Sequence, residues 1–100
     1  MDFKDLPLHD ALVKEITVNW QNKTVTLALE CFLKTSQSAQ PCLLRFTNVS
    51  SVLLPLASPW GESSSINGAS FDGNAFQIEV QSGDVLHVQS AAYDFETIGL

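Results

Sequence analysis

A period of two in the apolar residues between positions 12 and 34 constrains the fold of this chain more than any other feature. Such alternation puts apolar side chains on one face of an extended strand and polar side chains on the other. The stretches "LVKEITVNW" (12–20) and "TVTLALECFLK" (24–34) both follow it. They predict two half-buried strands, whose apolar rows are Leu12, Ile16, Val18 and Trp20 in the first and Val25, Leu27, Leu29, Cys31 and Leu33 in the second.

The residues between these two strands predict a hairpin. A two-residue turn at 21–22, whose asparagine tolerates a positive φ, places Val18 opposite Val25 and Ile16 opposite Leu27. Both apolar rows then lie on the same side of the hairpin. A slip of one residue would turn one row out to water, so the pattern itself favours this register.

The middle of the chain predicts two more short strands. After the polar loop "TSQSAQP" (35–41), the stretches "CLLRFTNV" (42–49) and "SSVLLPLA" (50–57) are each apolar enough for a strand. Pro55 places the second of them at a sheet edge or a strand end, because proline cannot donate to the ladder. Residues 58–74 are rich in Ser, Gly, Asn and Pro, and a connection of this length predicts either a functional loop or a further short pairing.

The last third of the chain predicts a second hairpin and a final strand. In "NAFQIEVQSGDVLHVQSA" two alternating runs flank a turn at 82–84, which keeps their apolar rows on one face. The tail "AYDFETIGL" alternates again and predicts one more strand. About six or seven antiparallel strands result, and neither a helix nor a repeat is indicated. The sequence therefore predicts an all-β single domain over residues 1–100, an antiparallel sandwich or small barrel.

Composition and charge restrict the function. With 45% hydrophobic residues the core needs neither metal nor disulfide, so Cys31 and Cys42 are expected to be ordinary buried thiols. The formal charge is −6, and the five basic residues are scattered, which argues against binding to nucleic acid or to an anionic membrane. No signal peptide or membrane-spanning run is indicated, so we expect a cytoplasmic protein. Its field favours a cationic partner or simply maintains solubility.

The residues available for chemistry do not define a reaction. His9 and Asp10 are adjacent, as a general base or two metal ligands could be, but neighbours in an extended segment point to opposite faces. We expect them instead to bond backbone groups where the chain joins the sheet. His87 lies opposite an apolar row and is expected on the surface, and the His and Cys spacings match no metal site. No cofactor, metal or catalytic residue is therefore expected.

The two tryptophans raise different expectations. Trp20 ends an apolar row and is expected in the core or at its rim. Trp60, in "PWGESSSIN" (59–67), has two open alternatives: a lid folded back over the core, or an exposed recognition loop with Phe71 and the serines 63–65. The predicted binding residues are Trp60, Ser63, Ser65, Phe71, His9 and Asp10.

Two parts of the chain resemble a group of small bacterial proteins of unassigned function. In that group "HDA" leads into a hairpin strand ending in "W" and continuing "TVTL", as in "LPLHDALVKEITVNWQNKTVTLAL", and "WGxSxSI" precedes "QSGD", as in "PWGESSSIN" and "IEVQSGDVLHVQSA". The resemblance covers about half of the chain. Related β-domains include immunity proteins of polymorphic-toxin systems, which neutralise a toxin domain by binding it. The resemblance implies binding roles for His9, Asp10 and Trp60, and a basic toxin domain as the partner.

Three functions follow from these observations. The first is a non-enzymatic interaction protein that binds a basic protein through acidic edges and the loop around Trp60. The second is a small-ligand module with a pocket beneath residues 58–74. The third is a hydrolase that uses His9 with a serine or an acid. Pairing of exposed strand edges between copies, which would give a homo-oligomer, is also open.

Overall fold

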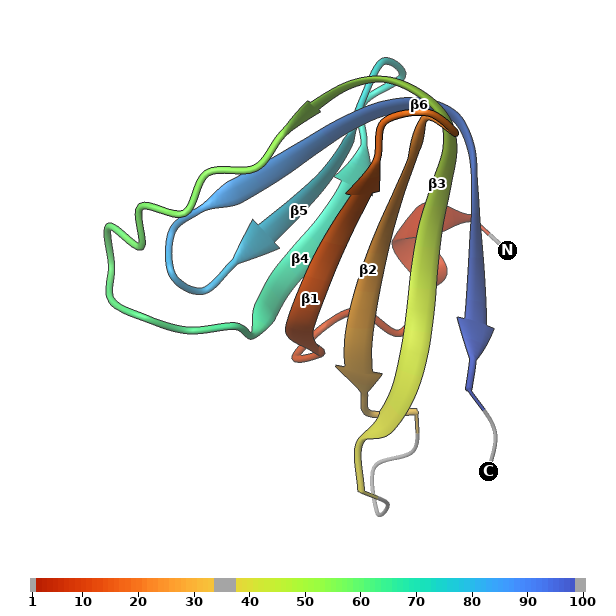
Figure 1. Cartoon of the computed structure of the whole chain (residues 1–100). Coiled ribbons are helices and arrows are strands. Elements are labelled where there is room, and N and C mark those ends of the chain that lie inside the picture. The colour runs from red at the N-terminus through yellow and green to blue at the C-terminus, as the bar shows by residue number, and fades with distance from the viewer. Residues whose placement is uncertain (1, 34–37, 99–100) are drawn as a thin grey trace.

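A computed structural model describes residues 2–33 and 38–98 of the chain. Within them, six strands form one antiparallel sheet in the order β1-β2-β3-β6-β5-β4 (Figure 1). The elements are η1, a 3₁₀ turn (Phe3–Asp5), and the strands β1 (Leu12–Asn19), β2 (Thr24–Cys31), β3 (Gln40–Leu53), β4 (Ile66–Phe71), β5 (Phe76–Val80) and β6 (Val85–Thr97). The predicted all-β class, antiparallel pairing and strand number are confirmed.

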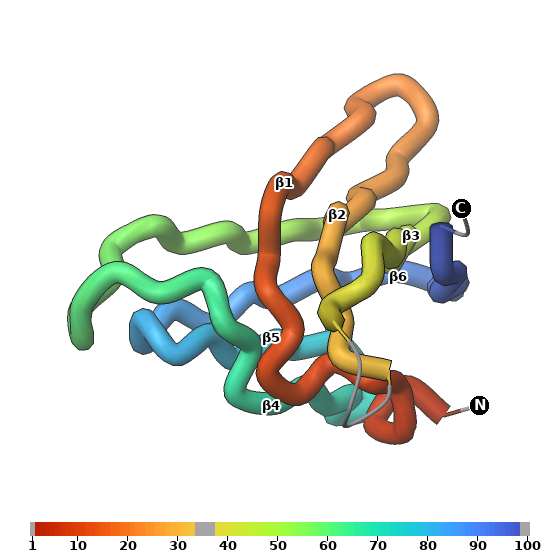
Figure 2. Tube along the Cα trace, turned by 90° about the horizontal axis from the view of Figure 1, so that it is seen from below, coloured from red at the N-terminus to blue at the C-terminus, as the bar shows by residue number. Residues whose placement is uncertain are grey.

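The sheet has neither the two separate layers of a sandwich nor the full closure of a barrel. Its two long strands, β3 and β6, pair over most of their length, from Cys42 opposite Thr97 to Leu53 opposite His87, and bend together, so that one sheet folds over itself (Figures 1 and 2). The first half of β3 also pairs with β2, and the first half of β6 also pairs with β5. The bend therefore lets a single sheet enclose a core from two sides.

The two edges of the sheet meet at one corner. The Asp10 amide donates to the Ile66 carbonyl (2.8 Å), and the Ile66 amide donates to the Ala11 carbonyl (2.8 Å). The Val13 amide donates to the Ser64 carbonyl (2.9 Å). These three bonds join the start of β1 to the start of β4, so the sheet is an open one whose edges touch over a few residues.

The enclosed core takes residues from every strand and from the N-terminal segment. Phe3 of η1 packs against Phe46, Phe76 and Tyr93, with ring centroids 4.8 to 6.0 Å apart. The N-terminal segment lies beside β4 and closes this end of the core (Figure 2). The largest fully buried side chains are Phe46, Leu8, Leu27, Leu29, Leu44, Ile66, Ile78, Val25, Val88, Cys31 and Cys42.

The first hairpin has the predicted register, with Val18 opposite Val25 and Ile16 opposite Leu27. Two local details differ. The positive φ falls on Lys23 (55°) instead of the turn asparagine. A bulge between Val13 and Glu15 reverses the alternation, so that Val13, and not Leu12, packs against the core with Ile16.

Other strand boundaries differ from the prediction. Residues 42–57 do not form two strands, because β3 continues through a positive φ at Asn48 (52°) and a bulge to Leu53. Pro55 lies just beyond that strand end, as expected. The tail is the second half of β6, which is continuous through Thr97, and residues 58–74 contain a pairing that the sequence did not specify, β4. In the second hairpin Phe76 lies opposite Val88 and Ile78 opposite Leu86, so the two apolar rows share one face, as predicted. The turn lies at 81–83, where the Val80 amide donates to the Asp84 carbonyl (2.9 Å), and not at the predicted 82–84.

Candidate functional site

Trp60 is exposed and does not cover the core. It lies in loop 54–65, the connection between β3 and β4, and 79% of its surface is accessible to solvent. Leu56 in the same loop is 87% exposed. The structure therefore shows that Trp60 is exposed, and the lid alternative is wrong.

The exposed indole is nevertheless held in place. The Trp60 amide donates to the Ser82 carbonyl in the β5–β6 turn (2.9 Å). One side of the indole rests on Gly83 of that turn: a Cβ added to Gly83 would lie 2.8 Å from Trp60 Cδ2 and 2.8 Å from Pro59 Cγ. Only glycine fits at such a close approach with a φ of 93°. We call loop 54–65 together with the turn 81–84 the Trp60 platform.

A buried carboxylate, Asp84, connects the two parts of this platform. Its oxygens accept hydrogen bonds from the Ala57 amide (3.0 Å), the Ser58 amide (3.0 Å) and the Ser82 hydroxyl (2.7 Å). The Ser82 hydroxyl first, and then the two amides, hold the pKa of Asp84 below its ordinary value of 3.8, because they bind the charged form. Asp84 is thus a structural anion that fixes the loop against the turn.

The serines of "ESSSI" form hydrogen bonds that join this loop to neighbouring segments of the chain. Ser64 and Ser65 use their carbonyls to accept the amides of Val13 (2.9 Å) and Gln81 (2.8 Å). The Ser63 hydroxyl accepts the Ser65 amide (3.3 Å). Ser63 and Ser64 also line a pocket of about 190 Å³ beneath the loop. That volume is below the roughly 300–1,000 Å³ of small-ligand sites.

His9 and Asp10 do come together, contrary to the expectation from an extended backbone. Asp10 has a φ of 65°, which turns its side chain toward that of its neighbour, and His9 Nε2 lies 3.6 Å from Asp10 Oδ2. The other ring nitrogen, His9 Nδ1, bonds the Asn67 carbonyl (2.9 Å), which confirms the predicted backbone bond. In the described part of the chain no serine hydroxyl bonds His9, and both members of the pair are exposed. The pair lies on the surface, where His9 connects the segment before β1 to β4.

Phe71 lies away from Trp60, so the predicted recognition loop does not hold together. It ends β4, whereas the platform meets the start of that strand, about 16 Å away at about 3.3 Å per residue. There its ring packs on Phe76 (4.6 Å) and borders a pocket of about 580 Å³ with Phe3 and Tyr93. Of the predicted binding residues, only Ser63 and Ser65 belong to the platform with Trp60.

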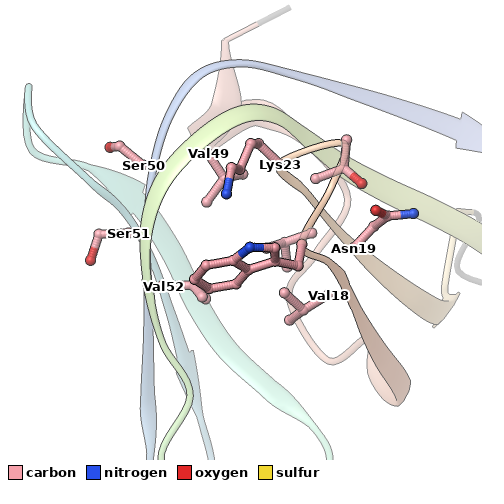
Figure 3. A pocket seen from close by; sticks show the side chains of 10 residues that line it. Val18, Asn19, Lys23, Val49, Ser50, Ser51 and Val52 are labelled. Carbon is pink, nitrogen blue, oxygen red and sulfur yellow. The ribbon is translucent and has the colours of Figure 1, made fainter.

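Trp20 is the other exposed tryptophan, and its expected place in the core is wrong. It sits in the β1–β2 turn with 79% of its surface accessible, because the hairpin tip extends past the core. The Lys23 ammonium lies 4.1 Å from the centre of its ring. The tip and the second half of β3 border a groove of about 480 Å³, which we call the Trp20 groove (Figure 3).

The charges of the chain are unevenly divided. All five cations lie at or before Arg45, and residues 46–100 contain no lysine or arginine. The same residues hold six acids: Glu62, Asp72, Glu79, Asp84, Asp94 and Glu96. Glu62 is exposed two residues from Trp60. The net negative charge thus comes from the half of the chain that builds the Trp60 platform. This division is visible in the sequence, but the net charge of the whole chain does not reveal it.

Within the described part of the chain, the cysteines and the other acids do not gather into a group that could hold a metal ion. Cys31 and Cys42 are buried free thiols, as predicted, and burial together with the nearby Cys42 raises the pKa of Cys31 to about 12. Among residues 2–33 and 38–98, no group of three or more His, Cys, Asp or Glu side chains could hold a metal ion. Over the same residues, none of the helical structure is long and apolar enough to span a membrane.

Comparison with known proteins identifies no relative of this chain. No family model matches this chain, and neither a curated protein nor a solved structure matches it.

Proposed function

We propose that this chain is a non-enzymatic interaction domain that binds a basic protein through the Trp60 platform. The supporting observation is that Trp60 is 79% exposed and yet fixed by a backbone bond to the turn 81–84. A large aromatic side chain that is already ordered loses little entropy on binding. Tryptophan is also the residue type most enriched among interface positions that carry binding energy.

The charge distribution supports a basic partner. Glu62 is an exposed residue of the platform, and the half of the chain that builds the platform carries no cation. Such a field accelerates the encounter with a positively charged protein and repels acidic ones. A basic toxin domain, neutralised by occlusion in a bacterial cytoplasm, is the partner class that the resemblance to immunity proteins implies.

The two tryptophans provide a matched test. Trp60 and Trp20 have the same exposure, 79%, and neither belongs to the core, so alanine at either position should leave the fold intact. We expect Trp60→Ala to weaken the partner complex at least about tenfold, whereas Trp20→Ala leaves it within about twofold of the wild type. Wild-type protein and both variants are used side by side as baits in the native lysate, and the captured protein is then titrated with each.

The outcome is decisive in either direction. A basic protein retained by the wild type and by Trp20→Ala, but lost with Trp60→Ala, supports the proposal. Equal recovery of the captured protein with both variants, or an acidic protein that is lost only with Trp60→Ala, contradicts it. If sedimentation shows only further copies of the chain in the complex, the platform is a self-association surface and the proposed basic partner is wrong.

A further inference from the structure

The second half of β3 has an open side. Its residues Ser51, Val52 and Leu53 pair with β6, opposite Gln89, Val88 and His87. On the other side, the pairing of β2 with β3 extends only to Phe46. Beyond it, the Val49 amide donates to the Lys23 carbonyl (2.9 Å), which among the described residues is the last backbone hydrogen bond between the first hairpin and this side of β3. In the described part of the chain no strand continues this side past Val49. An unpaired strand edge presents backbone groups that can accept another strand.

The Trp20 groove runs along this open side. Figure 3 shows Val18 and Lys23 on the hairpin facing Val49 and Val52 on β3, with the polar Ser50 and Ser51 along the strand. The apolar side chains that line the groove are Val18, Trp20, Val25, Val49 and Val52. The groove thus combines a strand edge with an apolar wall at its side.

The charge at this groove differs from that at the Trp60 platform. Lys23 is the one charged residue among those that line it, and its ammonium rests over the Trp20 ring. Among the described residues no acid lines the groove to neutralise Lys23. A negative group on a ligand would therefore favour binding in this groove, whereas the Trp60 platform favours a positive one.

We propose that the Trp20 groove binds an extended acidic peptide, which adds as a strand to residues 51–53 of β3. Strand addition satisfies the open edge, and alternate apolar side chains of the peptide pack against Trp20 and the valines. A carboxylate of the peptide pairs with Lys23. This site is separate from the Trp60 platform and does not depend on the function proposed for it.

The test uses a synthetic peptide and the full ¹⁵N-labelled chain. The probe is a blocked nine-residue peptide with valine at alternate positions, threonine between them, and glutamate in place of the central valine. We expect its addition to shift the amide signals of residues 51–53 and the indole signal of Trp20, while the indole signal of Trp60 stays unchanged. A matched peptide with lysine at the centre should bind about two- to fivefold more weakly, the range for one exposed ion pair.

Three protein variants, one of them a control, identify the side chains involved. Trp20→Ala should weaken binding at least about tenfold, and Trp60→Ala should leave it unchanged. Lys23→Asn removes the charge but suits the positive φ of that position, 55°, so it should abolish the preference for glutamate without disturbing the turn.

N-methylated peptides separate strand addition from binding by side chains alone. An added strand uses the amides of every second residue, so methylation in one phase should abolish binding and methylation in the other should preserve it. This readout requires no change to the protein. The proposal is overturned if both methylated peptides bind alike, if residues 51–53 show no shift up to saturation or to the solubility limit, or if Trp20→Ala binds like the wild type.

Discussion

At the scale of the residue, Asp84 decides whether Trp60 has a fixed position. Its carboxylate joins loop 54–65 to the turn 81–84 through the amides of Ala57 and Ser58 and the hydroxyl of Ser82. These donors would be left without a partner if the side chain were removed, and hydrogen bonds to a charged acceptor are stronger than neutral ones. The buried Asp84 carboxylate thus fixes the backbone that carries the exposed Trp60 side chain.

The lowered pKa of Asp84 gives this role a pH dependence. A carboxyl group with a lower pKa in the folded state contributes stability above its unfolded value of 3.8, and this contribution is lost as the pH falls below that value. We expect Asp84→Asn to lower the Tm by on the order of 5 °C at pH 7. The difference from the wild type should narrow as the pH falls below 3.8 and the wild-type carboxylate becomes protonated.

Thermal unfolding followed by circular dichroism measures this difference across the pH range. Glu62→Gln is the control, because Glu62 is an exposed carboxylate outside the Asp84 network and should leave the Tm within a degree or two at pH 7. A Tm gap for Asp84→Asn that stays constant from pH 7 to pH 2 would show that the charge of Asp84 does not stabilise the platform.

At the scale of the element, loop 54–65 and the β5–β6 turn act as one unit through Gly83. Two glycines allow the contact to be separated from the backbone: Gly83 and Gly73 have φ values of 93° and 92°, but only Gly83 has neighbours where a Cβ would be. Gly73→Ala should cost about 1–2 kcal/mol in free energy of unfolding from backbone strain alone. Gly83→Ala should cost about 1–3 kcal/mol more, because Pro59 and Trp60 must move.

Urea denaturation of both variants measures the two costs, and the fluorescence of Trp60 in a Trp20→Phe background reports the displacement of its ring. The expected result is a changed emission spectrum for Gly83→Ala and an unchanged one for Gly73→Ala. Equal destabilisation by the two substitutions, with unchanged emission, would mean that the loop does not rest on the turn.

The elements also show which parts of the fold follow from local sequence. The first hairpin was predicted with its register, since strands joined by a short turn are aligned by nearby alternation alone. In the second hairpin the shared apolar face was predicted, but the turn was placed at 82–84, whereas Val80 pairs with Asp84 around residues 81–83. The length of β3 was not predicted, because Asn48 and the serines after it resemble a turn when only local residues are considered. The pairing of that strand with β6 on both sides of the bend keeps it continuous. Strand β4 was missed because glycine and serine interrupt its alternation.

At the scale of the whole molecule, the three backbone bonds between the segments 10–13 and 64–66 hold the folded sheet together at its corner. If they are part of the cooperative core, the amides of Asp10, Val13 and Ile66 should exchange with solvent only through global unfolding. The Asn22 amide, bonded to the Asn19 side chain at the exposed hairpin tip, should exchange much faster and is the internal reference. Hydrogen exchange followed by NMR measures both, and rapid exchange at all four amides would show that the corner opens locally.

The candidate sites were predictable only in part. The two tryptophans and the serines of loop 54–65 were identified from the sequence, but their exposure and grouping were not. Trp20 continues an apolar row and yet extends beyond the core, because the hairpin is longer than the layer that it covers. Phe71 is near Trp60 in the sequence, but a full strand separates them in the structure. The open edge of β3 exists because β2 pairs with β3 only as far as Phe46, whereas β3 continues to Leu53.

The sequence by itself determined the class of fold, the register of the first hairpin, the existence of the second hairpin, the buried thiols and the acidic character of the chain. These features depend on alternation, turn residues and composition, which act between neighbours or over the chain as a sum. The tertiary structure alone decided the bend of β3 and β6, the corner where the edges meet, the seat of Trp60 on Gly83 and the groove beside Trp20. Each of these brings together residues far apart in the chain, and the free energy of such contacts depends on how the whole sheet folds around one core.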